Sequence, residues 1–363
     1  MDITGKITGI TYKVYLTEDL QEIEIATFDI NDAPPACIIK DGKHTFAVSK
    51  WVSPKRTRSY PYERVYNTLA FPRKVTVIPI VKDEGAAGDR DFVQWDTISL
   101  MSLLDVFVIL AYYDKAKKKG KKITNQQFNN EYILAKIREI EQYHSSALHW
   151  NLKELTDNLN HIIDRAKIAY DKIERKTGVK LHSFDGIVKF QKRIGEDVSR
   201  FMAFSREKAQ KAQAREYATI QPKERVIALK KAKLTINNYL GGQYFFTVDE
   251  IQLAETVSLI EAKHSASALL PSKSDIKDGL LKMILYSNLS DTKLEGVDVV
   301  CNPILKLTSE KLKGSISSKS SSEELEIFFQ TNHFNQVQET FVRLLFTEAR
   351  SNNFEVKVQQ AND

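Results

Sequence analysis

The sequence contains little cysteine and no long hydrophobic run. Its two cysteines, Cys37 and Cys301, lie far apart in the 363 residues. Two thiols cannot form a disulfide framework or a four-cysteine zinc site, so we expect both to be buried. No stretch approaches the roughly 20 apolar residues of a membrane helix, and the polar residues 1–16 lack the apolar core of a signal peptide. We therefore expect a cytoplasmic protein with no membrane partner.

The composition is that of a folded protein, with 42% hydrophobic and 28% charged residues, and the length favours more than one domain. The net charge is only +6. The basic residues cluster in four runs, at positions 50–58, 115–122, 193–215 and 223–233. Such clusters suit binding to phosphates, although solvated helix faces explain some of them equally well.

The hydrophobic pattern predicts an α+β or α/β protein in three regions. Residues 1–122 are rich in strand patterns and are the expected DNA-recognition region. Residues 123–220 carry helical periodicity and are expected to contact DNA or to mediate dimerisation. Residues 221–363 mix both patterns, with a helix at 224–239, strands at 244–253 and 257–264, and an amphipathic helix at 276–286.

The segment from Tyr244 to Ser265 carries the most informative pattern. Two strands joined by a short polar turn predict a hairpin, in which Glu261 and Lys263 point to the same face. Asp249 on the preceding strand can approach that face. Two carboxylates, with the backbone carbonyl of Ala262, suit a hard divalent cation. Lys263 can orient the attacking water and offset charge on a phosphate.

Glu-x-Lys spacing is common, and this chain contains it elsewhere. Residues 174–176 (Glu-Arg-Lys) lie in a helical pattern, where side chains two apart diverge. Residues 355–357 lack an aspartate on a strand just upstream. Charged groups in an apolar strand pattern are costly unless paired or metal-bound, so a structural salt bridge is the alternative to catalysis at Glu261 and Lys263.

Asp249 followed by Glu261-Ala-Lys263 resembles the PD-(D/E)XK nuclease superfamily, over roughly residues 224–307. The resemblance implies a restriction-endonuclease-like α/β core with a mixed central sheet, and phosphodiester cleavage that depends on Mg²⁺, with Mn²⁺ as a substitute. It implies Asp249 and Glu261 as metal ligands and Lys263 as the catalytic lysine. Val248 stands where the motif's name has proline.

Within that superfamily the chain looks most like a type II restriction endonuclease, which cleaves double-stranded DNA at a specific sequence. The resemblance adds Glu224, ahead of the hairpin, as a further catalytic candidate. A homodimer follows from cutting two strands with one site per chain. The expected DNA-contacting residues are basic, aromatic or polar side chains in three segments: Lys55, Arg56, Arg58, Tyr60 and Arg64; His149 and Asn151; and Lys273 and Lys277.

Two other functions remain open at this point. One is a DNA repair, methylation-dependent or antiviral nuclease of the same superfamily. The other is a non-catalytic DNA-binding protein with a decayed nuclease core. Discrete bands after plasmid digestion indicate site-specific cleavage, a smear indicates a non-specific nuclease, and no cleavage indicates the binding protein.

Overall fold

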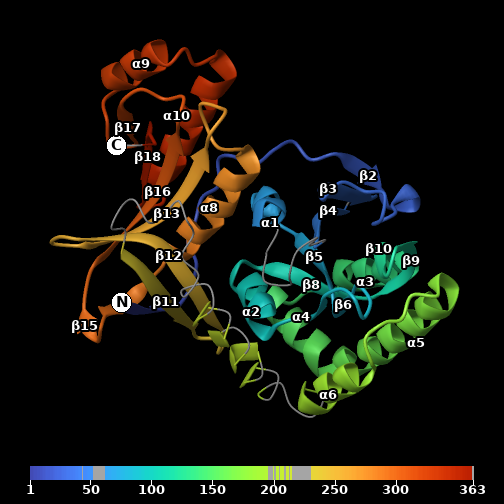
Figure 1. The fold of residues 1–363 in the computed structure, drawn as a ribbon. Coiled ribbons are helices and arrows are strands. Elements are labelled where there is room, and N and C mark those ends of the chain that lie inside the picture. The colour runs from blue at the N-terminus through green and yellow to red at the C-terminus, as the bar shows by residue number, and fades with distance from the viewer. Residues whose placement is uncertain are drawn as a thin grey trace. The chain divides into compact units, whose positions relative to one another are not determined.

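A computed structural model (Figure 1) describes residues 1–42, 44–51, 62–194 and 230–361, together with scattered positions between 199 and 214. The chain forms two compact units. Unit 1 consists of Met1–Glu18 and Lys208–Asp363, and unit 2 consists of Asp19–Glu207. These boundaries differ from the three predicted regions, because the first 18 residues belong with the C-terminal part of the chain.

Unit 1 is built on a mixed nine-stranded sheet, in the order β15-β14-β1-β11-β12-β13-β16-β18-β17 among the described residues. Its longer strands are β1 (Asp2–Ile7), β11 (Lys230–Asn238), β12 (Gln243–Leu253), β13 (Val257–Ser265), β16 (Cys301–Ser309) and β18 (Glu355–Gln360). The shorter ones are β14 (Ser290–Leu294), β15 (Val297–Asp298) and β17 (Ser315–Ser317). β12 is antiparallel to both β11 and β13, whereas β13, β16 and β18 run parallel to one another.

Helices cover one face of this sheet. α8 (Lys273–Tyr286) packs on β13 and β16, and α10 (Gln336–Ser351) packs on β18 (Figure 1). α9 (Ser322–Thr331) lies against β17. Leu280 of α8 and Leu305 and Leu307 of β16 are fully buried, so an apolar helix face meets the apolar sheet face. This layer fixes where α8 stands relative to the hairpin β12–β13.

Unit 2 has its own five-stranded sheet in the order β2-β3-β4-β5-β8, formed by β2 (Glu22–Glu24), β3 (Ala36–Asp41), β4 (His44–Lys50), β5 (Lys74–Pro79) and β8 (Val106–Ala111). Two further strand pairs are β6 (Val81–Asp83) with β7 (Arg90–Phe92), and β9 (Tyr113–Lys119) with β10 (Lys122–Phe128). Its helices are α1 (Tyr62–Thr68), α2 (Trp95–Leu103), α3 (Asn130–Glu141), α4 (Ala147–Lys153), α5 (Leu159–Thr177) and α6 (Asp185–Ile194).

The helix predicted at 224–239 is wrong for residues 230–238, which form strand β11. Ala232, Leu234 and Ile236 are buried at a spacing of two, as in a strand. Over a longer window the same apolar residues also fit a helical spacing, so the pattern alone allows a helix or a strand. The strand forms because this segment pairs with β1 and β12. The mixed α and β content of the prediction is confirmed. No helix among the described residues is long and apolar enough to cross a membrane.

Candidate active site

The predicted acidic residues stand where two strands of unit 1 part. The ladder between β12 and β13 ends at the pair Glu250↔Ile260. Beyond this pair β12 stays beside β11, while β13 continues beside β16. Asp249 and Glu261 are the next residues on the two strands, so they face each other across the opening of a fork.

The side chain of Asp249 links the two strands at the fork. Its Oδ2 accepts a hydrogen bond from the backbone N–H of Ala262 at 3.0 Å. The N–H and C=O of one strand residue point to the same side, so the Ala262 carbonyl is also directed toward the fork. Two of the three predicted metal ligands are therefore linked directly, and the third faces them.

Glu261 is held by two ammonium groups. The Nζ of Lys282, from α8, lies 2.8 Å from both carboxylate oxygens. The Nζ of Lys263 lies 3.0 Å from Oε1 of Glu261 and 2.8 Å from Oδ2 of Asp278. Glu261 is only 1% exposed, so these contacts offset the cost of burying its charge.

Local sequence explains why these groups meet. Strand alternation places Glu261 and Lys263 on the face of β13 that α8 covers. Asp278 and Lys282 are four residues apart, on one face of the helix. Between them, Gly279 permits close approach, because a Cβ there would lie 2.7 Å from Leu305 Cδ1 and 3.4 Å from Lys263 Cε. A larger residue at position 279 would push the helix away from the site.

The carboxylates have opposite pKa shifts. Burial, reinforced by the charge of Glu261, raises the pKa of Asp249 to about 6. Burial alone would raise the pKa of Glu261 as well, but Lys282 and Lys263 together lower it. Burial opposes charge on Lys263, yet Glu261 and Asp278 raise its pKa, so it stays cationic. Near neutral pH the site therefore holds two charged lysines, a charged Glu261 and an Asp249 close to its titration point.

The donor set suits a small, hard cation that retains several waters. Among the described residues no group of three or more His, Cys, Asp or Glu side chains is placed to hold a metal ion. Two carboxylates and the Ala262 carbonyl are enough for Mg²⁺, which typically binds one or two protein carboxylates and completes its shell with water. A divalent ion would also oppose the burial and the Glu261 charge that together raise the pKa of Asp249.

Several predicted DNA contacts lie in unit 2. Asn151 is 1% exposed, and its amide bonds to the N–H of Val108, to Ser102 and to the Val106 carbonyl. A buried amide used in this way cannot reach DNA, which corrects the prediction for Asn151. Arg64 donates to the Lys50 carbonyl at 3.0 Å, a contact inside the fold.

His149 is accessible, whereas the two lysines predicted on unit 1 differ. His149 is exposed on α4, where its ring stacks on Tyr143. Lys273 is exposed at the start of α8. Lys277 is 1% exposed and pairs with Glu18 at 2.7 Å, so its charge serves the fold and the predicted DNA contact is corrected. Five predicted site residues lie outside the described residues: Lys55, Arg56, Arg58, Tyr60 and Glu224.

Lys282 and Asp278 were not predicted from the sequence. A signal was present, because both are charged residues, as is Lys277, within the largely apolar segment 276–286, where an unpaired charge would be costly. The sequence alone could not assign their partners, since Lys282 and Glu261 are 21 positions apart.

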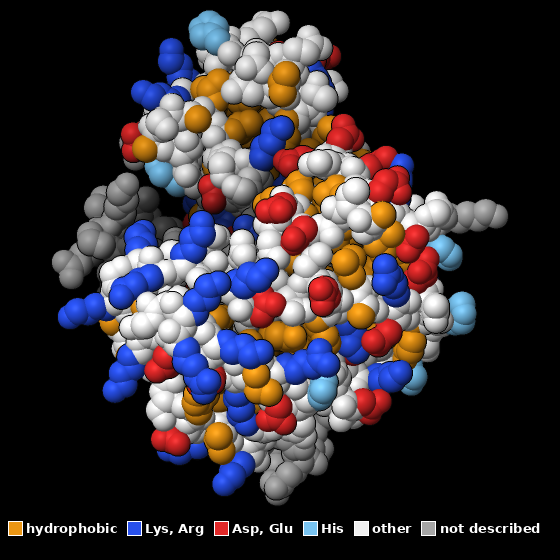
Figure 2. Space-filling model, turned by 90° about the vertical axis from the view of Figure 1, so that its right-hand side faces the viewer, with side chains coloured by type: hydrophobic (Ala, Val, Ile, Leu, Met, Phe, Trp, Pro, Cys, Tyr) orange, Lys and Arg blue, Asp and Glu red, His pale blue; other side chains and the backbone are white. Residues whose placement is uncertain are grey.

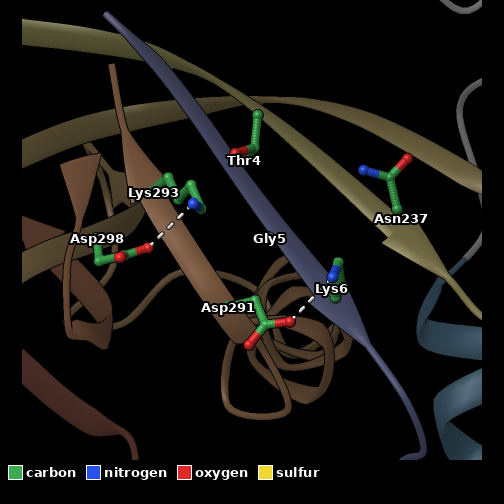
Figure 3. Close-up of a pocket in the computed structure, with 7 residues that line it drawn as sticks. All are labelled: Thr4, Gly5, Lys6, Asn237, Asp291, Lys293 and Asp298. Atoms are coloured by element: carbon green, nitrogen blue, oxygen red, sulfur yellow. Dashed lines mark hydrogen bonds and ion pairs between the residues drawn. The ribbon is translucent and has the colours of Figure 1, made fainter. Parts of the chain in front are cut away.

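A separate hollow of about 280 Å³ lies on the same sheet, where β15, β14, β1 and β11 contribute to its lining (Figure 3). It is lined by Thr4, Gly5, Lys6, Asn237, Asp291, Lys293 and Asp298. Its charged side chains form two ion pairs, Lys6 with Asp291 at 3.0 Å and Lys293 with Asp298 at 3.3 Å. It contains none of the predicted site residues, and we assign it no role in the chemistry.

Comparison of the chain with protein-family models, with curated proteins and with solved structures gives no match.

Proposed function

We propose that this protein is a Mg²⁺-dependent endonuclease of the PD-(D/E)XK type that cleaves double-stranded DNA at a specific sequence, as a type II restriction enzyme does. The observation that carries the proposal is the meeting of Asp249, Glu261 and Lys263 at the fork between β12 and β13. The mixed sheet, with α8 packed on the strands that bear these residues, supports a restriction-endonuclease-like core in unit 1.

Asp249, Glu261 and the carbonyl of Ala262 would hold the Mg²⁺ ion, with Mn²⁺ able to replace it. Bound there, the ion supplies Lewis-acid polarisation of the phosphate and a water of lowered pKa. Lys263 contributes positive charge beside the scissile phosphate rather than a proton acceptor, because Glu261 and Asp278 keep it protonated. Lys282 donates to both oxygens of Glu261, neutralises its charge and holds the carboxylate in place.

Plasmid digestion tests the proposal. The purified chain with Mg²⁺ should convert supercoiled plasmid into discrete linear fragments, and excess chelator should prevent it. Asp249→Asn and Lys263→Gln should abolish cleavage while DNA binding persists. Glu250→Gln is the matched control, because Glu250 is next to Asp249 on β12 but pairs with Lys306 instead.

Two results would refute this assignment. Full cleavage by Lys263→Gln would remove the site from the reaction. Absence of cleavage with Mg²⁺ or Mn²⁺, on methylated and unmethylated DNA, would favour a DNA-binding protein without catalysis. The proposed homodimer is tested separately by light scattering on the purified protein with and without duplex DNA.

A further inference from the structure

The hairpin β9–β10 of unit 2 carries an unusual concentration of positive charge. Its strands and turn contain six lysines within eight positions: Lys115, Lys117, Lys118, Lys119, Lys121 and Lys122. We call these six residues the basic ribbon. All six are exposed, and no aspartate or glutamate occurs between positions 115 and 130. Figure 2 shows many Lys and Arg side chains across the lower part of the surface.

This run forms a two-stranded ribbon, so it is not one of the solvated helix faces considered for the basic runs. Gly120 and Lys121 form the turn, and Gly120 has φ +61°, the left-handed conformation that a type II′ hairpin turn needs at its first central position. Tyr113 and Phe128 stack at the other end of the hairpin and are buried. One end is thus anchored in the core and the lysine-rich end reaches solvent.

The lysines of the ribbon are not neutralised within the part of the chain that the structure describes. No ion pair of their ammonium groups occurs there, and the nearby Glu84 pairs with Lys82 at 3.0 Å. Lys119 stands directly opposite Lys122 in the ladder. Like charges in directly opposed positions destabilise a hairpin, so the fold tolerates a repulsion that an external polyanion would relieve.

A seventh lysine, distant in sequence, lies close to the turn. Lys180 follows α5 and is exposed. The carbonyl oxygens of Lys121 and Lys180 both lie within 3.5 Å of where a Cβ on Gly85 would stand. The loop at Gly85 therefore brings the backbones of two exposed lysines, 59 positions apart in the chain, to one corner of unit 2.

The spacing of the ribbon suits a nucleic-acid backbone. Side chains two apart on a strand, such as Lys115, Lys117 and Lys119, are separated by about 6.8 Å. Adjacent phosphates of one DNA strand advance by only about 3.4 Å along the helix axis, but they also wind around it, so they are about 7 Å apart in space. The lysines of this row can therefore meet successive phosphates of a single strand.

From the charge, the missing acidic partners and this spacing we propose that the basic ribbon binds the phosphate backbone of double-stranded DNA. This inference rests on the proposed nuclease function, because that function is the reason to name DNA, rather than another polyanion, as the ligand. Phosphate contacts of this kind position the duplex and do not read its sequence.

The test is the salt dependence of duplex binding without divalent metal, measured by fluorescence anisotropy. The double variant Lys117→Gln/Lys119→Gln should lower the slope of log affinity against log salt by about 1.8, because each lost phosphate contact contributes about 0.9. This corresponds to about 30-fold weaker binding near 0.15 M salt. Lys311→Gln/Lys313→Gln, exposed lysines with the same spacing in unit 1, should leave the slope unchanged.

Three outcomes would overturn the inference. The first is an equal salt slope in the two double variants, and the second is aggregation of the ribbon variant with unchanged DNA binding, which would mean that the lysines protect an exposed strand edge from pairing with other chains. The third is a ribbon variant that binds phosphatidylserine vesicles more weakly than the wild type but binds duplex DNA equally well. The nuclease proposal is tested independently. Salt-dependent duplex binding without plasmid cleavage refutes the nuclease alone, and cleavage with an unchanged slope refutes the ribbon alone.

Discussion

Replacing Lys282 by methionine removes one of the two ammonium groups that neutralise the buried Glu261. Methionine has a similar length and fills space flexibly, so the change is mainly electrostatic. Removing one partner of a buried pair costs about 3–5 kcal/mol, and the lower end applies here because Lys263 remains 3.0 Å from the carboxylate. A loss of about 3 kcal/mol in a unit of this size lowers the unfolding temperature by roughly 6–12 °C.

The loss should depend on pH. Lys282 helps to lower the pKa of Glu261 in the folded protein, which stabilises the fold above the unfolded pKa of about 4.3 and ceases to do so as pH falls. The unfolding temperatures of the wild type and of Lys282→Met should therefore converge in acid. Thermal unfolding followed by calorimetry across this range measures the effect.

A matched variant separates stability from metal binding. Lys306 is 20% exposed and pairs with Glu250, much as Lys282 is 19% exposed and pairs with Glu261. Lys306→Met should destabilise the fold at least as much, because Lys306 is the only ammonium group paired with Glu250 among the described residues. Only Lys282→Met frees an oxygen of a proposed metal ligand, so only this variant should bind Mg²⁺ more tightly than the wild type in titration calorimetry. Equal Mg²⁺ affinity in the two variants would contradict Glu261 as a ligand beside Lys282.

Three further perturbations test the site and the fold. Mg²⁺ affinity should fall about tenfold for each pH unit below 6, where Asp249 protonates, and level off above 7; a flat profile in titration calorimetry would exclude Asp249 as a ligand. Gly279→Ala gains about 1 kcal/mol of helix propensity but must displace Leu305, at a cost of about 1–3 kcal/mol, so we expect slower cleavage and no gain in unfolding temperature. Asn151→Ala leaves the Val108 N–H without its partner, so chemical denaturation should show a loss of about 1–3 kcal/mol, while duplex affinity of the folded protein stays unchanged.

The central part of the candidate site could be predicted from the sequence. The strands around Asp249 and Glu261, and the helix at 276–286, were confirmed to within a few residues. Apolar residues at every second position, together with charged residues inside that apolar strand, form a local signal. A single short segment of the sequence contains all of it. The same local reasoning assigned DNA contacts to Asn151 and Lys277, and failed because burial depends on what packs over a residue.

The sequence by itself determined which segments alternate, which carry charge, and which charged residues stand in an apolar pattern. Only the tertiary structure decided that residues 230–238 pair as a strand between β1 and β12, and that the first 18 residues join the C-terminal part of the chain. Only the tertiary structure pairs Lys282 with the carboxylate of Glu261, and Asp278 with the ammonium group of Lys263. Strand pairing and helix packing join positions distant along the chain, and their free energy comes from surfaces that no local window contains.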